Sequence, residues 1–448
     1  MLTNIKLKNF KSFKNVEIDF QSKRGQSKPL IIIYGENGSG KTTISQAFLA
    51  LKRTMATMQV KGMLKDLLDE KFSPPEDFPL KPDIMLKILK SKLSMDGIEN
   101  LIEEYKMINS NENMSLEYEF NIDGGSGCYY VEMDSYNIVK ERLEFRLNKK
   151  RGCYFNIEDD DVYINEKIFE SKEFYELISN QVEMYWGKHT LLSILYFEMG
   201  DKSDTYINSN ISMNLMKLMT AFENINFRIP RDPEGQSLTL NAANKFFGHL
   251  VSGTIEKKDK SKLDEVEKLI NQFFKSLFND VVKAFYKKSG TKDEIQYDLF
   301  LRKRIENYEF DIDFNLESNG TKEIMDLLPY LVSAVSGSCV IIDEYGIGIH
   351  DLLATKLLAA IGNQIKGQLI LTTHNTMLMD YAEVNPETLY FIMNDKTFKK
   401  SVKCVTEIEE RLHPNYNYRK RYFTNDLYKD AIPDLDNNIN LQDLARLY

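Results

Sequence analysis

Residues 30–43 read LIIIYGENGSGKTT, an apolar run that leads directly into a glycine-rich turn. The turn matches the pattern G-x-x-x-x-G-K-[ST], whose glycines let the backbone wrap around phosphate oxygens. A helix is predicted to follow over 41–58, and its first N–H groups would add donors for an anion. The stretch therefore predicts a phosphate-binding loop made of Gly35, Asn37, Gly38, Ser39, Gly40, Lys41, Thr42 and Thr43.

Two side chains of this loop have separate roles in our interpretation. Lys41 would reach the β- and γ-phosphates of a nucleotide and take part in catalysis. The Thr42 hydroxyl would be a ligand of Mg²⁺. The loop thus predicts a site for ATP and Mg²⁺.

Two further apolar strands end in polar residues. Residues 339–344 read CVIIDE, and residues 369–375 read LILTTHN. Adjacent carboxylates after a buried strand are costly unless a cation or a water uses them. We therefore interpret Asp343 as a second Mg²⁺ ligand and Glu344 as the catalytic base that polarises a water. His374 follows a strand at the edge where open α/β sheets bind ligands, so it is a third catalytic candidate.

Strand and helix patterns alternate at both ends of the chain, and the strands at 29–34, 339–342 and 368–372 are largely apolar. Such strands are typical of a parallel sheet that is covered on both faces. Residues 3–20 predict a hairpin, and residues 116–168 predict an antiparallel meander. We therefore predict an α/β fold with a mostly parallel sheet and an antiparallel β subdomain.

The middle of the chain, residues 169–287, carries apolar residues at three- and four-residue spacing, which predicts a helical insertion. Its best coiled-coil candidate is a pair of helices of about 25–30 residues each, roughly 40 Å long. We divide the chain into a first half of the ATPase domain (1–168), this insertion, and a second half with the tail (288–448). The insertion is expected to contact a partner or a second copy; packing of its helices on one another is the other interpretation.

The composition bounds the functional class. The chain has 448 residues, a net charge of −9 and four Cys without a C-x-x-C pair. This argues against a disulfide scaffold or a zinc site and fits a reducing compartment. The start lacks a signal-peptide core, and the apolar runs are far shorter than the roughly 20 residues of a membrane helix. We expect a cytoplasmic protein with no membrane partner, and the acidic balance favours a protein partner over DNA.

The phosphate loop, the IIDE strand and the TTH strand, in this order around a long insertion, resemble the ABC-type ATPase heads of SMC, RecF and OLD proteins. The opening NFKSFKN at 9–15 resembles the N-terminal hairpin of these heads. The stretch ESNGTKE at 317–323 resembles the compact OLD-like branch, commonly labelled AAA family ATP-binding proteins. Residues 418–422 and 431–433 resemble the tail of the same branch.

This resemblance implies that two heads pair head-to-tail around two ATP molecules, each also contacted by a signature loop of the other head. Here the signature residues would be Ser318 and Gly320, before a helix predicted over 321–333. An ordinary N-cap is the alternative interpretation of Ser318. The family's Mg²⁺-contacting Gln is missing, because no Gln lies between residues 59 and 181. Either another side chain replaces it or hydrolysis is slow.

The resemblance also suggests a biological role. ATPases of this branch occur in bacterial anti-phage systems (PARIS, Septu and abortive-infection types), where homo-oligomers control a separate nuclease or toxin. The D-x-D triplet at 434–436 is similar to that of Toprim nucleases, but we interpret it as a turn. We expect a homo-oligomeric ATPase that senses a trigger, such as a phage protein, and controls a separate effector. A RecF-like DNA-repair ATPase that binds DNA and a nucleotide-gated scaffold with little turnover remain alternatives.

Overall fold

The computed structural model describes most of the chain. The described residues are 1–22, 25–68, 97–147, 150–200, 202–230, 236–237, 247–291, 293–380, 385–395, 397–408 and 417–424, with the backbone alone at 59–68 and 236–237. The tail motifs predicted at 431–433 and 434–436 lie outside these residues. None of the described helices is both long enough and apolar enough to cross a membrane.

The chain forms two compact units. The first comprises Leu2–Met216 with Asn385–Tyr448, and the second comprises Lys217–Val384 with Met1. The boundaries predicted at 168 and 287 stay a prediction, because compact units and domains need not coincide.

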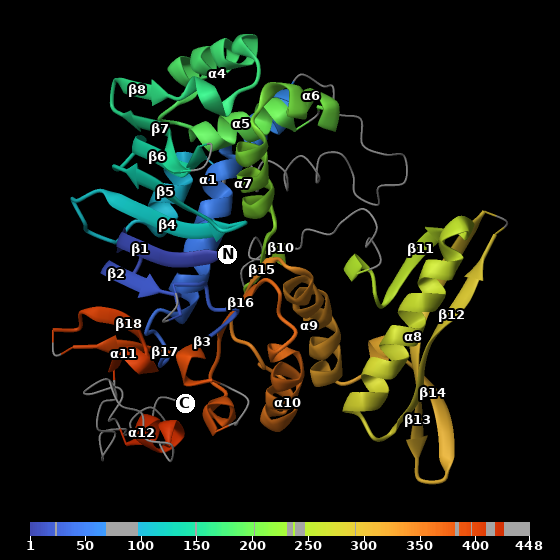
Figure 1. Ribbon diagram of the computed structural model, residues 1–448. Coiled ribbons are helices and arrows are strands. Elements are labelled where there is room, and N and C mark those ends of the chain that lie inside the picture. The colour runs from blue at the N-terminus through green and yellow to red at the C-terminus, as the bar shows by residue number, and fades with distance from the viewer. Residues whose placement is uncertain are drawn as a thin grey trace, which may run out of the picture. The chain divides into compact units, whose positions relative to one another are not determined.

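A seven-stranded antiparallel sheet dominates the first unit, in the order β2-β1-β4-β5-β6-β7-β8. Its strands are β1 (Leu2–Phe10), β2 (Phe13–Asp19), β4 (Met114–Ile122), β5 (Gly125–Met133), β6 (Ile138–Leu147), β7 (Lys150–Glu158) and β8 (Asp161–Ile164). Helix α1 (Lys41–Leu68) lies along one face of this sheet, where the Tyr118 hydroxyl donates to the Ala47 carbonyl at 2.5 Å (Figure 1). The predicted hairpin and meander are confirmed.

The first unit also contains the strand that precedes the phosphate loop. This strand, β3 (Leu30–Tyr34), is completely buried and pairs in parallel with β17 (Leu389–Asn394), which pairs antiparallel with β18 (Lys400–Cys404). Within the described residues, the other α-helices that begin in this unit are α3 (Ile98–Tyr105), α4 (Lys172–Tyr185), α5 (Leu191–Met199), α6 (Asp204–Asn210), α7 (Met213–Glu223), α11 (Val405–Ile408) and α12 (Tyr418–Phe423).

Parallel strands form the centre of the second unit. Strand β15 (Cys339–Ile342) pairs in parallel with β9 (Ile225–Arg228) and β16 (Gln368–Thr372), and the short β10 (Gln236–Ser237) pairs antiparallel with β9. Helix α9 (Asn319–Ser336) precedes β15, and α10 (Asp351–Gly362) connects it to β16. Strands β15 and β16 span the predicted residues, and the α/β prediction with parallel and antiparallel sheets is confirmed.

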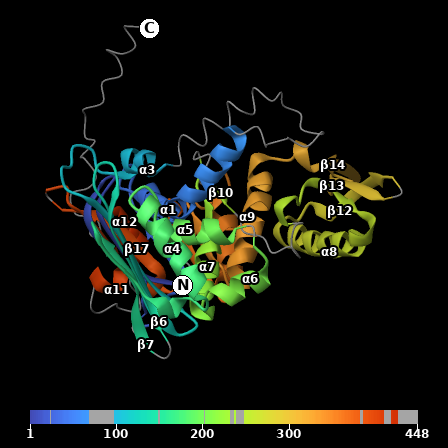
Figure 2. The same ribbon diagram turned by 90° about the horizontal axis from the view of Figure 1, so that it is seen from above.

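A lobe of the second unit comprises β11 (Ser252–Glu256), α8 (Lys260–Leu277), β12 (Val281–Gly290), β13 (Glu294–Ile305) and β14 (Tyr308–Asp313). Helix α8 covers one face of its antiparallel sheet (Figure 2). Phe274 of α8, Leu299 and Leu301 of β13 and Met325 of α9 belong to one buried apolar cluster. The lobe therefore packs on α9 within the same unit.

The coiled-coil prediction for 169–287 is wrong. Helices α4 to α8 have only 14, 9, 7, 11 and 18 residues, and β9, β10 and β11 interrupt them. A three- and four-residue spacing fits several short helices as well as two long ones. The breaks lie at residues that end or start helices, such as Gly187 with its φ of 93° and the N-caps Thr190 and Ser203.

Candidate nucleotide-binding site

The phosphate loop connects β3 to α1, as predicted. Gly40 has a φ of 119°, and a Cβ on it would lie 2.7 Å from Cζ of Phe13, so only glycine fits this position. Ser39, Lys41 and Thr43 are buried, whereas Asn37, Gly38 and Thr42 are exposed. The loop thus has buried residues and an accessible rim, which is formed by Asn37, Gly38 and Thr42.

The Lys41 side chain is held inside the loop. Its Nζ donates to the Gly35 carbonyl at 2.6 Å and to the Glu36 carbonyl at 2.9 Å. Burial raises the pKa of the Glu36 carboxyl, and the charge of Lys41 opposes this shift. The Ser39 hydroxyl is buried and has no hydrogen-bond partner among the described residues. An ammonium and an unsatisfied hydroxyl therefore lie in the loop, as a phosphate requires.

The end of β15 is organised by Thr372 at the end of β16. The Thr372 hydroxyl donates to Asp343 Oδ1 at 2.5 Å and accepts from the Glu344 N–H at 2.9 Å. Its carbonyl accepts from the Tyr345 N–H at 2.8 Å. From the other side, the Asp343 N–H donates to the Arg228 carbonyl at 2.9 Å. Asp343, only 1% exposed, is therefore held by both neighbouring strands, its carboxylate by Thr372 and its backbone by β9.

Glu344 has a backbone and a side chain that are unusual for an ordinary strand end. Its φ of 55° lies in the left-handed region, which costs free energy for a residue with a Cβ. Its Oε2 is buried without a hydrogen-bond partner among the described residues. An unsatisfied carboxylate oxygen beside a fixed aspartate fits a site that receives a water or a cation-bound group.

The residues after β16 form a tight turn. The Thr373 hydroxyl donates to the Tyr345 carbonyl at 2.8 Å and accepts from the Asn375 N–H at 3.0 Å. The Asn375 amide donates to the Asp351 carbonyl at 2.8 Å. His374 lies between these buried residues and is exposed. The turn therefore places His374 on the surface at the end of β16, as predicted.

The predicted signature residues lie at the start of α9. Ser318 is its N-cap, and its hydroxyl accepts from the Thr321 N–H at 3.2 Å. A Cβ on Gly320 would lie 2.8 Å from the Gly348 carbonyl, so the first turn of α9 packs directly against the loop that follows β15. Ser318 is therefore an N-cap, which fits both interpretations of this residue, because an exposed N-cap is also compatible with contact to an anion.

A buried ion pair supports this helix start. Lys303 of β13 donates to Glu317 Oε2 at 2.7 Å, and the two side chains are 15% and 4% exposed. Sequence reasoning missed Lys303, although the alternation of β13 places it on the same face as Leu299 and Leu301. A charged residue in register with buried apolar residues is the signal that could have found it.

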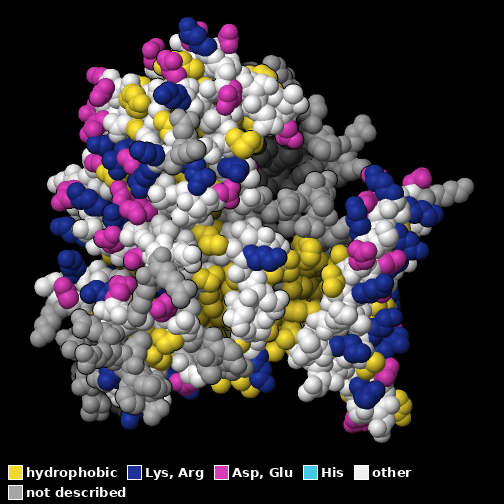
Figure 3. All heavy atoms as spheres, viewed as in Figure 1, with side chains coloured by type: hydrophobic (Ala, Val, Ile, Leu, Met, Phe, Trp, Pro, Cys, Tyr) yellow, Lys and Arg dark blue, Asp and Glu magenta, His cyan; other side chains and the backbone are white. Residues whose placement is uncertain are grey.

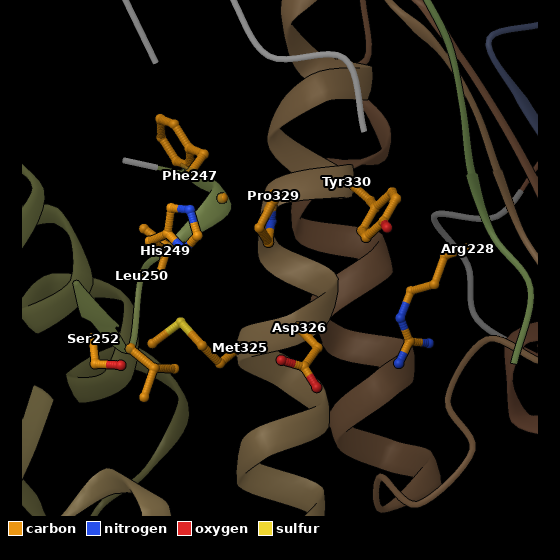
Figure 4. A pocket seen from close by; sticks show the side chains of 11 residues that line it. Arg228, Phe247, His249, Leu250, Ser252, Met325, Asp326, Pro329 and Tyr330 are labelled. Carbon is orange, nitrogen blue, oxygen red and sulfur yellow. The ribbon is translucent and has the colours of Figure 1, made fainter. Parts of the chain in front are cut away.

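The second unit also contains a cavity of about 590 Å³ between residues 247–252, α9 and the end of β9. Figure 4 shows His249 and Leu250 on one side and Asp326 and Arg228 on the other. Arg228 donates to Glu323 at 2.8 Å, and burial raises the pKa of Asp326, opposed by the charge of Arg228. The residues that line the cavity include none of the predicted site residues, which the structure places instead in the phosphate loop and at the ends of β15 and β16 and the start of α9.

The predicted site residues belong to both units. The loop residues and Lys41 lie in the first unit, and Asp343, Glu344, His374 and Ser318 lie in the second. Within the second unit, the structure brings Asp343 and Glu344 onto one threonine, Thr372, to which sequence reasoning gave no role.

Comparisons with known proteins agree with a nucleotide site. Residues 4–52 match the AAA domain family. Residues 30–380 match the family described as "AAA domain, putative AbiEii toxin, Type IV TA system". No curated protein matches the chain.

Among solved structures, the SMC head domain from Thermotoga maritima is 15% identical, and the match covers 90% of this chain and 98% of that chain. The TM-score of 0.38 is too low for that likeness to carry an argument. The family match from 30 to 380, by contrast, takes in the phosphate loop, the signature turn and both strand ends. Because this match covers more than half of the sequence, the chain belongs to this family of AAA domains, whose members bind nucleotides.

Proposed function

We propose that this protein binds ATP with Mg²⁺ and hydrolyses it. The observation that carries the proposal is the phosphate loop, in which Lys41 lies among backbone carbonyls at the start of α1. A phosphate oxygen is a stronger acceptor for an ammonium than a neutral carbonyl, so a nucleotide is expected to displace these contacts. Titration of a fluorescent ATP analogue into wild-type protein and Lys41→Ala tests this. Equal affinity of the two proteins would overturn the assignment.

Thr42 and Asp343 are the residues that we propose as Mg²⁺ ligands. The fixed, buried carboxylate of Asp343 and the unsatisfied oxygen of Glu344 fit an oxygen-ligated hard cation and its water shell. Bound Mg²⁺ supplies charge neutralisation for the phosphoryl group that is transferred. Glu344 accepts the proton of the attacking water, and His374 contributes from the end of β16.

Glu344→Gln separates hydrolysis from binding. Loss of a general base lowers a rate by about 10²–10⁴-fold, whereas the amide leaves the shape of the site unchanged. We expect near-normal ATP affinity and almost no phosphate release. Normal phosphate release from this variant would assign the base to another residue.

We propose that the functional unit is a homodimer in which Ser318 and Gly320 of one copy contact the ATP of the other. Exposed apolar side chains lie just before the signature turn and on the loop that packs against it: Leu316 is 79% exposed and Ile347 is 42% exposed, and Leu352, 38% exposed, follows that loop. Exposed apolar side chains gathered at a candidate site are typical of a surface that another chain covers. Mixing Lys41→Ala with Ser318→Arg should restore part of the activity, because a mixed dimer holds one intact composite site. No recovery, with a monomeric mass in ATP, would contradict this arrangement.

A separate effector, such as a nuclease, under control of this ATPase in anti-phage defence is our proposal for the biological role. It is supported by the resemblance of 317–323 and by the family description, which mentions a toxin system. A DNA-repair role is less well supported. Lys and Arg side chains line the lobe in Figure 3, but Lys288 pairs with Asp264 and Glu267, and Arg302 pairs with Asp311. Co-purification with the product of the neighbouring gene, with and without ATP, tests the effector proposal.

A further inference from the structure

A second lysine touches the phosphate loop from outside. Lys400, at the start of β18, donates from Nζ to the Gly38 carbonyl at 3.1 Å. The same nitrogen lies 5.8 Å from the ring centroid of Phe13, the residue that packs against Gly40. Half-burial lowers the pKa of the Lys400 ammonium. The lysine is therefore docked on the loop, with part of its hydration removed.

The face of the β17–β18 hairpin that carries Lys400 is the one that meets the loop. Lys400 is the cross-strand partner of Asn394, and cross-strand partners point to the same face. Ile392, two residues before Asn394 and so on that face, lies 3.2 Å from where a Cβ of Gly35 would be. The hairpin thus contacts the loop at Gly35 through Ile392 and at Gly38 through Lys400.

An unsatisfied polar atom lies on the same face. The Oδ1 of Asn394 is buried and has no hydrogen-bond partner within the described part of the chain. An acceptor without a donor costs free energy in a folded protein unless a ligand or water supplies one. Lys400 and an unsatisfied acceptor are therefore cross-strand neighbours on the face of the hairpin that meets the loop.

We propose that Lys400 is a second cationic residue of the nucleotide site, which binds the polyphosphate chain of ATP from β18. This inference rests on the proposed ATP binding and adds a residue outside the glycine-rich motif. The Gly38 carbonyl is a neutral acceptor, so an anionic phosphate oxygen near the loop rim competes for the ammonium with a charge-assisted hydrogen bond. The partial desolvation of Lys400 strengthens that attraction, because the local dielectric constant is lower than in water.

The test compares two lysines of one strand. Lys403 is the partner of Phe391 in the ladder, so it lies on the opposite face of the hairpin from Lys400, and it is exposed. Lys400→Met and Lys403→Met therefore remove the same charge from the same strand, but only the first removes it from the loop. Lys400→Arg keeps the charge.

We expect Lys400→Met to weaken the affinity for a fluorescent ATP analogue about ten-fold, and Lys400→Arg to retain most of the wild-type affinity. Lys403→Met should bind like wild type. The deficit of Lys400→Met should shrink as the salt concentration rises, because screening weakens the lost electrostatic attraction. Thermal melts without nucleotide should show equal stability for the three variants.

Wild-type affinity of Lys400→Met would overturn the inference. A deficit that is independent of salt and shared by Lys400→Arg would also overturn it, because it would indicate packing instead of charge. Lys41→Ala, measured in the same titration, separates the role of Lys400 from the proposed binding of ATP. If wild type and Lys41→Ala both fail to bind ATP, the proposed function fails. If Lys41→Ala loses binding while Lys400→Met binds like wild type, only the role of Lys400 is wrong.

Discussion

Helices α5 and α9 begin in opposite ways, although a buried carboxylate lies at the start of each. At α5, the N-cap Thr190 accepts from the Ser193 N–H at 3.0 Å. Glu141 of β6, which is 0% exposed, accepts from the Leu191 N–H at 2.7 Å and more weakly from the Leu192 N–H at 3.5 Å. The first N–H groups of α5 are thus sealed by a side chain from the neighbouring sheet.

At α9, the adjacent carboxylate binds a lysine instead of the first N–H groups of the helix. Ser318 accepts from the Thr321 N–H, but Glu317 pairs with Lys303 of the lobe. Ser318 and Asn319 are exposed. The start of α9 therefore keeps its surface open to solvent, while a buried ion pair fixes the backbone just before it.

The difference separates a structural helix start from one that remains accessible to a ligand. A carboxylate at α5 occupies the place that an anion would take, whereas α9 presents its first turn without one. The two carboxylates are also stabilised differently. Glu141 relies on N–H and O–H donors, among them the Trp186 Nε1 at 3.0 Å and the Tyr129 hydroxyl at 3.0 Å, and Glu317 relies on a cation. The two helix starts should therefore be destabilised by different changes: that of α5 by a change of pH, and that of α9 by removal of the lysine.

The largest effect is expected for Lys303→Met. This change leaves Glu317 as a buried charge without its cation, and removal of one partner of a buried pair costs about 3–5 kcal/mol. Urea unfolding should show a loss in this range. The double variant Lys303→Met/Glu317→Gln should recover much of it, because no uncompensated charge remains.

Arg302→Met is the matched control for that experiment. Arg302 is the residue before Lys303 in β13, and its ion pair with Asp311 lies on the surface. Ion pairs on the surface contribute little to stability, so this variant should unfold nearly like wild type. Equal losses for Lys303→Met and Arg302→Met would show that the position of the charge is unimportant.

The second-largest expected effect is a pH dependence of the free energy of unfolding that is due to Glu141. Burial raises the pKa of Glu141 to about 7 from an ordinary 4.5, although its hydrogen-bond donors oppose the shift. The folded state therefore holds the proton more tightly than the unfolded state. The resulting stabilisation is fully present below about pH 4.5 and is lost as the pH rises through about 7, which amounts to about 3 kcal/mol.

Subtraction isolates this contribution from the other carboxyls. The free energy of unfolding of wild type minus that of Glu141→Gln should fall between pH 5 and pH 7.5. Glu144 of the same strand is partly exposed and pairs with Arg151, so Glu144→Gln is the control for loss of a carboxyl group from β6. A flat difference curve for Glu141→Gln would mean that the carboxylate is charged throughout.

The nucleotide elements of this protein were predictable because each has a local signature. Strands β3, β15 and β16 are largely apolar, and each is followed at once by the residues that carry chemistry. Burial on both faces favours apolar residues at successive positions, so such a strand is recognised without knowing its period or register. The hairpin of β1 and β2 was predictable for a different reason, because apolar and polar residues alternate in parts of both strands, as at 5–8 and 16–19.

The supporting contacts were not predictable, because they join distant parts of the sequence. Thr372 fixes Asp343 across 29 residues, and Lys400 reaches Gly38 across 362 residues. Neither contact has a pattern in the primary sequence. The coiled-coil prediction for 169–287 was wrong for another reason. The apolar spacing of this segment is helical, but the number and direction of its short helices depend on tertiary packing.

The smallest effect on stability, about 1 kcal/mol, is expected for Ser318→Ala, which removes the N-cap of α9. Ser171 provides a matched control, since its hydroxyl accepts from the Phe174 N–H at 3.2 Å at the start of α4. Ser171→Ala should cost a similar amount, and urea unfolding measures both. Their consequences for ATP should differ, however, because only α9 is proposed to contact the nucleotide of a second copy.

Mass measurement in ATP, in a Glu344→Gln background that prevents turnover, gives the decisive comparison of these two caps. Ser318→Ala should reduce ATP-dependent dimerisation, because a hydroxyl at an open helix start is lost from the composite site. Ser171→Ala should dimerise normally despite a similar loss of stability, since both variants remain folded. If both variants dimerise equally well, the open start of α9 is a solvent-exposed cap and nothing more, and the contrast with the sealed start of α5 has no functional meaning.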